Sequence, residues 1–186
     1  RRKLDDRPRD ILAFFAGNID PNRYDSPVLQ QNYGVCSRLS LFKEILKAAG
    51  NDRLVLVETW DEREKLKGDL SNKVVIVNSF KAGLNHDEYF GLLARSRFFW
   101  GMPGLSYPWA HNLTEAIFMG ATPILEFPER ISERLVDSKN CLVFKGEGEI
   151  RTVLERAASM NDADMQLMKR NVLSLYDSEF SPEAVV

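Results

Sequence analysis

Short apolar runs recur along the chain, and between them apolar residues return every three or four positions. An apolar run bounded by glycine, proline or asparagine is typical of a buried strand. The clearest example is ILAFFA at residues 11–16, which ends at Gly17 and Asn18. The pattern predicts six strands, at residues 11–16, 54–58, 74–77, 98–100, 123–125 and 141–144.

The segments between these runs have helical periodicity. Leu39, Phe42, Ile45 and Leu46 share one side of a helix that Gly50 closes. Strands that alternate with helices predict an α/β fold with a doubly wound, mostly parallel six-stranded sheet, Rossmann-like and ordered 3-2-1-4-5-6. A long loop is expected between the first strand and the first helix. Helices are expected at residues 37–49, 61–67, 85–95, 110–119, 129–137, 149–159 and 162–176.

Composition and charge describe an ordinary globular chain. Its 186 residues suffice for one well-buried core, and 44% hydrophobic with 28% charged residues argues against disorder. Residues 1–10 carry eight charges and a proline, which predicts an exposed lead-in or linker before a single domain over residues 11–186. A net charge of −2 gives no general attraction to nucleic acid or to an anionic membrane.

Several kinds of site and location are not expected. Cys36 and Cys141 lie far apart, with no CxxC and no histidine at ligand spacing, so neither a disulfide nor a zinc site is predicted. No apolar run approaches 18 residues and no signal peptide is visible, so no transmembrane segment is expected. A cytoplasmic location is the default, and a Golgi-type lumen is the alternative if a leader was removed before Arg1.

The most informative stretch covers residues 97–126. It predicts a strand, a loop rich in glycine and proline, a helix from about residue 110, and a second strand. Leu113, Ala116 and Ile117 form the buried face of that helix, while His111 and Glu115 lie near its start on the other side. This places polar residues at the carboxyl ends of the strands, where α/β sheets bind ligands. Alternatively, residues 112–115 form a capping box in which Glu115 only reaches back to the helix start.

This stretch resembles the nucleotide-sugar-binding half of GT-B glycosyltransferases, most closely the exostosin-like family. The resemblance rests on four motifs in order: SRF at residues 96–98, Pro-Gly at 103–104, EAI at 115–117 and Gly-Ala-Thr-Pro-Ile-Leu at 120–125. It implies that Glu115 accepts hydrogen bonds from the ribose of a nucleotide sugar. It also implies that the loop and the helix start hold the diphosphate, through Gly104, Ser106, His111 and Asn112.

Further candidates lie near the ends of the first and third strands. Arg38 is in the first turn of a helix, where a cation opposes the helix dipole and requires solvent or an anion. A diphosphate near Gly17 and Asn18 would supply that anion, and the family that the chain resembles carries arginines in this region. Phe80 follows the third strand, where GT-B enzymes place the base, although it could instead belong to the core. A solvated arginine explains Arg38 at least as well as a ligand does, and Arg23 is a weaker candidate still.

The resemblance also implies a reaction. It predicts sugar transfer from a nucleoside diphosphate sugar, UDP- or GDP-linked, to a glycan or another hydroxyl acceptor. Retaining GT-B enzymes commonly have a second glutamate eight positions before the first, but Tyr107 occupies that place, which favours inversion. The catalytic base then belongs to an acceptor-binding domain in the same or another chain. Asp162 and Asp164 are interpreted as helix caps, so no metal site and no cofactor is predicted.

Two alternatives remain at this stage. One is a nucleotide-sugar epimerase of the same architecture, which would consume donor without an acceptor. The other is a non-catalytic nucleotide-binding or interaction module. A phosphoacceptor receiver would carry an acidic pair after the first strand, and a dinucleotide dehydrogenase would carry GxGxxG there. Gly17 and Asn18 stand in that place, which disfavours both of these classes.

Overall fold

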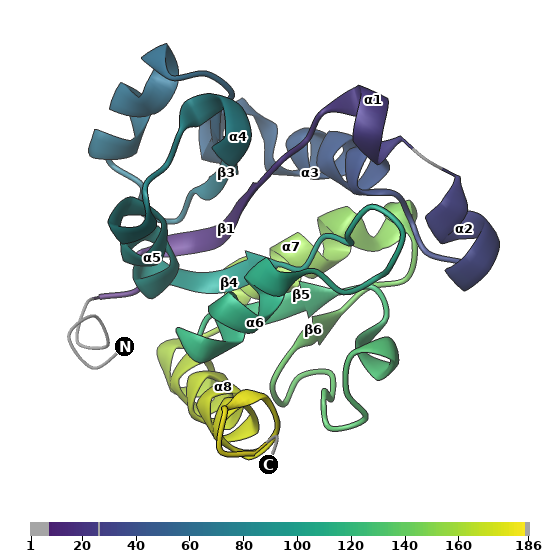
Figure 1. Ribbon diagram of the computed structural model, residues 1–186. Coiled ribbons are helices and arrows are strands. Elements are labelled where there is room, and N and C mark those ends of the chain that lie inside the picture. Colours follow the sequence, from purple (N-terminus) through teal and green to yellow (C-terminus); the bar gives the residue numbers. More distant parts are fainter. Residues whose placement is uncertain (1–7, 26, 185–186) are drawn as a thin grey trace.

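The computed structural model describes residues 8–25 and 27–184, and its centre is a six-stranded sheet (Figure 1). Every strand pairs with its neighbours in parallel. The α/β, Rossmann-like fold class predicted from the sequence is confirmed. The order across the sheet is β2-β3-β1-β4-β5-β6. The strands are β1 Ile11–Gly17, β2 Leu54–Val57, β3 Val74–Asn78, β4 Ser96–Trp100, β5 Thr122–Leu125 and β6 Leu142–Val143.

The predicted strand order 3-2-1-4-5-6 is wrong on one side of the sheet. The strand next to β1 is β3, and β2 forms the edge. Burial explains the exchange, because all five residues of β3 are buried whereas β2 is mostly half-buried. A strand covered on both faces and flanked on both sides is buried throughout, whereas an edge strand keeps some exposure.

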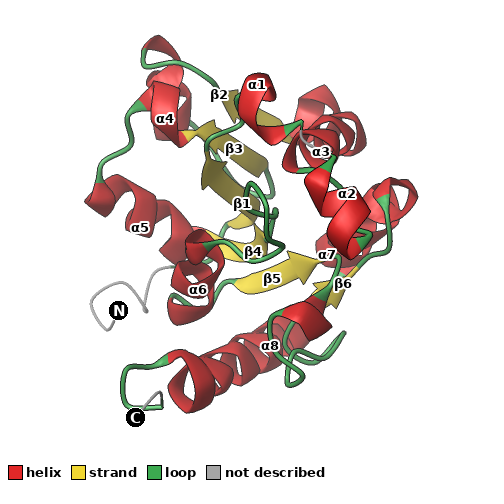
Figure 2. Cartoon of the chain, turned by 45° about the vertical axis from the view of Figure 1, so that its right-hand side comes forward, coloured by secondary structure: helices red, strands yellow, loops and turns green. Residues whose placement is uncertain are grey.

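Helices cover both faces of the sheet, as a doubly wound fold requires (Figure 2). The contacts group α3 with α7 on one face, while α5, α6 and α8 lie on the other. Asparagine or serine side chains cap three of the longer helices, at Ser37, Asn85 and Asn161. The α-helices are α1 Pro21–Tyr24, α2 Val28–Tyr33, α3 Arg38–Arg53, α4 Ser79–Ala82, α5 His86–Arg95, α6 His111–Phe118, α7 Ile150–Ser159 and α8 Asp162–Leu175.

Shorter turns replace some of the predicted elements. The segment at residues 61–67 is a 3-10 helix, η1 Asp61–Lys67, and the long loop after β1 contains α1 and α2. The helix predicted at residues 129–137 is wrong, because only Pro128–Arg130 forms a single 3-10 turn. The Asn140 side chain accepts from the Val136 N–H and donates to the Arg134 carbonyl, which holds this segment in a loop.

In the described part of the predicted lead-in, Pro8 is exposed, whereas Arg9 and Asp10 are half-buried and anchored to the domain. The Asp10 carboxylate accepts two hydrogen bonds from Arg95, and the Arg9 side chain donates to the carbonyls of Ser96 and Met119. The remainder of that prediction, residues 1–7, lies outside the described residues. Among the described helices, none combines the length and the apolar character needed to cross a membrane.

The connections change direction at β1. From β1 the chain passes to β2 and β3 on one side of the sheet, and then crosses to β4, β5 and β6 on the other. The carboxyl ends of β1 and β4 therefore lie side by side, while the segments that follow them lead in opposite directions. Open α/β sheets leave a crevice at such a switch point.

Candidate functional site

A cavity of about 770 Å³ opens at the switch point between β1 and β4. Its walls come from the end of β1, the start of α3, α4, α5, the loop between β4 and α6, and the first turns of α6. Eight of the ten residues predicted from the sequence line it. These are Gly17, Asn18, Arg38, Phe80, Gly104, His111, Asn112 and Glu115.

Helix α6 brings Asn112 and Glu115 into the cavity. The N-cap residue of this helix is Ala110, which has an extended backbone and no side chain that could cap. The capping-box interpretation of residues 112–115 is therefore wrong, since Asn112 is already the second residue of the helix. Its side-chain amide donates to the Ala16 carbonyl at 3.2 Å, and its buried Oδ1 atom has no hydrogen-bond partner among residues 8–25 and 27–184. The first N–H groups of α6 consequently face the cavity without a side-chain cap.

Arg38 is a buried cation in the cavity wall. Only 5% of the residue is exposed, its Nε donates to the Pro103 carbonyl at 2.8 Å, and a terminal nitrogen donates to the Asn18 carbonyl at 3.0 Å. The guanidinium stacks over the Tyr24 ring at 4.1 Å. Among the described residues no carboxylate pairs with it. Burial lowers the pKa of Arg38, and the interpretation as a solvated arginine is wrong.

Tyr89 is a cavity residue that the sequence analysis missed. It lies on α5, and no described residue lies within hydrogen-bonding geometry of its buried hydroxyl. Burial raises the pKa of the Tyr89 phenol, and the nearby Glu115 carboxylate adds to the shift. The sequence signal that could have identified Tyr89 is its spacing. It lies one helical turn after Asn85, at the start of the helix that follows the third strand. A polar group that is buried and unsatisfied at a cavity wall is a natural contact for a polar ligand.

Two glycines allow the backbone to fold closely around the cavity. A Cβ atom at Gly17 would lie 2.7 Å from the Phe15 ring, and one at Gly104 would lie 3.1 Å from the carbonyl oxygens of Tyr107 and Trp109. The Gly104 N–H also donates to the Tyr107 carbonyl at 2.9 Å. The loop between β4 and α6 is thus a tight turn that carries Trp109 to the cavity.

Aromatic residues and histidines border the opening. Phe80 is 76% exposed, so the alternative that placed it in the core is wrong. His86 and His111 are the first residues of α5 and α6, and both are exposed at the cavity wall. Two predicted residues do not line the cavity: Ser106 is exposed in the loop after β4, and Arg23 is exposed on α1.

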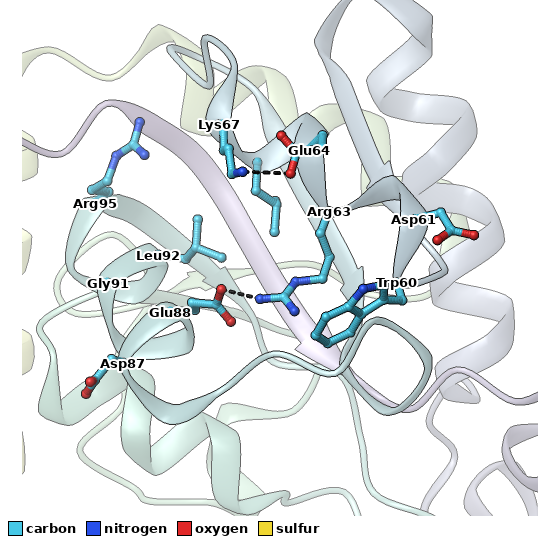
Figure 3. Close-up of a pocket in the computed structure, with 11 residues that line it drawn as sticks. Trp60, Asp61, Arg63, Glu64, Lys67, Asp87, Glu88, Gly91, Leu92 and Arg95 are labelled. Atoms are coloured by element: carbon cyan, nitrogen blue, oxygen red, sulfur yellow. Dashed lines mark hydrogen bonds and ion pairs between the residues drawn. The ribbon is translucent and has the colours of Figure 1, made fainter.

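A second cavity of about 800 Å³ lies between η1 and α5 (Figure 3). Figure 3 shows Arg63 between the ring of Trp60 and the carboxylate of Glu88, with which it forms an ion pair. Lys67 likewise pairs with Glu64. None of the residues that line it carries a buried polar atom without a hydrogen-bond partner. The cavity at the switch point is therefore the better candidate for a binding site.

The described residues contain no cluster of three or more histidine, cysteine or acidic side chains that could hold a metal ion. Asp162 and Asp164 occupy the first turn of α8, but the cap of that helix is Asn161. The Asp164 N–H donates to the Asn161 side chain at 2.9 Å. The interpretation of these aspartates as part of the helix start holds, while their assignment as the cap itself is wrong.

Comparison with known proteins gives a weak likeness. No protein-family model matches the chain, and no curated protein matches it. One similar solved structure is the C-terminal domain of the glycosyl transferase group 1 family protein LpcC from Francisella tularensis. It shares 13% sequence identity and a TM-score of 0.48, over 91% of this chain and 85% of that one. A likeness at this level carries no functional argument.

Proposed function

We propose that this chain is the donor-binding domain of a glycosyltransferase and that a nucleoside diphosphate sugar occupies the cavity at the switch point. The observation that carries the proposal is Arg38, a buried cation without a carboxylate partner among the described residues, on the wall that also holds Asn112 and Glu115. Burying an uncompensated charge is costly, so its persistence is best explained by an anionic ligand. The uncapped start of α6 adds positive potential to the same cavity.

Each group has a role in this proposal. The diphosphate accepts hydrogen bonds from Arg38 and from the first N–H groups of α6. The Glu115 carboxylate accepts from the ribose hydroxyls, and the Oδ1 atom of Asn112 accepts one further ligand hydroxyl. The exposed ring of Phe80 stacks on the base. The contact to Asn112 would satisfy a buried oxygen atom that has no hydrogen-bond partner among the described residues, which further supports the assignment.

In the proposed reaction, negative charge develops on the leaving diphosphate as the sugar is transferred. The acceptor hydroxyl oxygen attacks the anomeric carbon, and the bond from that carbon to the diphosphate oxygen breaks. The hydroxyl proton passes to a base supplied by an acceptor-binding domain, and inversion results because attack is opposite the leaving group. The leaving diphosphate gains negative charge, which Arg38 and the α6 N–H groups stabilise without a metal ion.

Calorimetric titration with UDP, GDP, ADP and TDP, in the absence of divalent metal, tests the binding step. One diphosphate should bind selectively. Substitution Glu115→Ala should then cost about 1.5–3 kcal/mol, or roughly 10- to 150-fold in affinity, because a charge-assisted hydrogen bond to ribose is lost. The matched control is Glu155→Ala, an exposed glutamate on α7, which should bind as the unmodified protein does.

Product analysis separates the proposal from its enzymatic alternative. A transferase consumes the donor sugar only when an acceptor and the acceptor-binding domain are present. Donor turnover by this chain alone would favour the epimerase. Binding of none of the four diphosphates would contradict the assignment of the cavity and favour an interaction module.

A further inference from the structure

A third cavity, of about 320 Å³, lies at the opposite edge of the sheet. Arg97 is the second residue of β4 and Thr122 is the first residue of β5, so this cavity lies at the amino ends of the strands. The candidate donor site lies at their carboxyl ends. We propose that this third cavity binds a doubly charged oxyanion, either inorganic phosphate or the phosphate group of a small monoester. This inference does not depend on the proposed function.

The charges that line the cavity favour an anion. Three basic side chains, Arg9, Arg97 and Lys169, and one acidic side chain, Asp162, line the cavity. Asp162 is the first residue of α8, so its negative charge is already matched by the positive end of that helix dipole. No ion pair joins it to Arg97 among the described residues.

The two arginines differ in how their donors are used. The Arg9 guanidinium donates to the carbonyls of Ser96 and Met119, which fixes it at the cavity wall. Arg97 donates only through Nε, to the Arg9 carbonyl at 2.9 Å. Its two terminal nitrogens have no hydrogen-bond partner among the described residues. A guanidinium held at Nε with its terminal N–H groups open can form a bidentate contact with a phosphate.

An independent observation comes from Thr122. The residue is completely buried and lines the cavity, and its hydroxyl has no hydrogen-bond partner in the described part of the chain. A buried hydroxyl without a partner is destabilising, and native proteins rarely retain one without a reason. A phosphate oxygen beside Arg97 would accept from this hydroxyl, and the side-chain amide of Gln166 offers a further donor in the same wall. The volume holds about ten water molecules at roughly 30 Å³ each, which leaves room for the carbon atoms of a monoester.

The test uses nitrogen-detected NMR of the whole chain at low ionic strength, with chloride held constant. Titration with inorganic phosphate should shift the Arg97 Nε resonance and the backbone amides of Thr122 and Gln166. Glycerol 3-phosphate serves as the monoester probe. Tighter binding of the monoester would identify an esterified phosphate as the source, and tighter binding of inorganic phosphate would identify the free ion. Both results support the site.

Two variants decide whether the site is built from these residues. Arg97→Gln should weaken phosphate binding about tenfold, whereas Arg151→Gln, an exposed arginine on α7, should not change it. Thr122→Val keeps the side-chain volume and removes only the hydroxyl. It should fold at least as stably as the unmodified protein and bind phosphate several-fold more weakly.

Three results would overturn the proposal. The first is no shift at Arg97 or Thr122 in millimolar phosphate. The second is binding by both variants that equals binding by the unmodified protein. The third is a phosphate response confined to Arg38, which would place the ion in the donor site alone. Arg97→Gln should leave nucleoside diphosphate affinity unchanged, so failure of this site and failure of the proposed function are distinguishable.

Discussion

At the scale of single residues, the candidate site consists of polar groups that the described protein does not satisfy by itself. The Arg38 cation, the Asn112 Oδ1 atom and the Tyr89 hydroxyl are all buried. Among the described residues, Arg38 has no carboxylate partner and the two oxygen atoms have no hydrogen-bond partner. The folded protein bears this cost without a ligand. We therefore expect binding residues here to reduce stability, a common trade-off at functional sites.

Substitution Arg38→Met should separate the contribution of Arg38 to ligand affinity from its contribution to protein stability. Loss of the contacts to Pro103 and Asn18 costs stability, whereas removal of a buried cation restores some, so the free energy of unfolding should change by less than about 1 kcal/mol. Affinity for the selected nucleoside diphosphate should fall roughly 10- to 150-fold. Urea unfolding and calorimetry measure the two quantities. A loss of several kcal/mol with unchanged affinity would make Arg38 a purely structural residue.

The sequence identified most of these residues because each lies at a strand end or a helix start. Arg38, His111 and Glu115 were found in this way. Tyr89 was missed because it reaches the cavity from the second turn of α5, and that depends on how α5 packs beside α6. Ser106 does not line the cavity, because the loop makes a tight turn at Gly104 and no local sequence pattern reports the direction of that turn.

At the scale of elements, the decisive feature is the start of α6. A helix usually begins with a side chain that accepts from its first N–H groups, but here Ala110 occupies that position. The capping-box pattern at residues 112–115 was misleading because it correctly predicts a helix start but places it two residues late. By contrast, Asn85 and Glu88 form a true capping box on α5.

Substitution Ala110→Ser tests whether the open helix start has a function. The backbone of Ala110 is already extended, so serine can cap without rearrangement and should stabilise the protein by about 0.5–1 kcal/mol. The new cap competes with the diphosphate for the same N–H groups, so nucleotide affinity should fall several-fold. Ala110→Gly, which leaves the N–H groups open, is the control and should retain affinity. Equal affinities of all three proteins would show that the α6 start does not contact the ligand.

Other elements show where local patterns suffice and where they fail. The six strands could be predicted because short, continuous apolar runs bounded by turn residues are typical of the buried strands of a parallel sheet. The order of the strands could not be predicted. Whether β2 or β3 lies next to β1 depends on tertiary packing, which the local sequence does not report. The segment at residues 129–137 has helical composition, yet the side-chain hydrogen bonds of Asn140 hold it in a loop.

At the scale of the whole molecule, the two proposed binding cavities lie at opposite ends of the strands. The proposed donor site lies at the carboxyl ends of the strands and the proposed oxyanion site at the amino ends. The two cysteines also lie in different parts of the fold, Cys36 half-buried and Cys141 buried. Cys36 donates to Glu126 near the end of β5, and Cys141 is completely buried next to β6.

Stability should fall in alkaline solution. Burial raises the pKa of Cys36 and of Cys141 from 9.0 to about 12 in the folded protein. Because the folded pKa is raised, the stabilisation is complete below pH 9 and is lost as the pH rises toward 12, where the unfolded chain releases protons that the folded chain retains. The fully buried Cys141 should contribute a slope of about 1.4 kcal/mol per pH unit in this window.

Urea unfolding of the unmodified protein and of Cys141→Ala from pH 8 to 11 measures this contribution. Other groups titrate equally in both proteins, so the difference between the two slopes reports Cys141 alone. The alanine variant should be less stable at pH 8 and should lose stability more slowly above pH 9. Parallel pH dependence of the two proteins would contradict the shifted thiol pKa.

The central claim is that a nucleoside diphosphate binds at the switch point, and three arginines can report its location in one experiment. Arg38, Arg63 and Arg97 each line a different cavity, so their Nε resonances can be followed while the selected diphosphate is added. The account predicts a saturable shift at Arg38 and none at Arg63. Any response at Arg97 should come from the phosphate site and should weaken several-fold in Thr122→Val. A saturable shift at Arg63 with Arg38 unmoved would place the ligand in the cavity beside Trp60 and contradict the account.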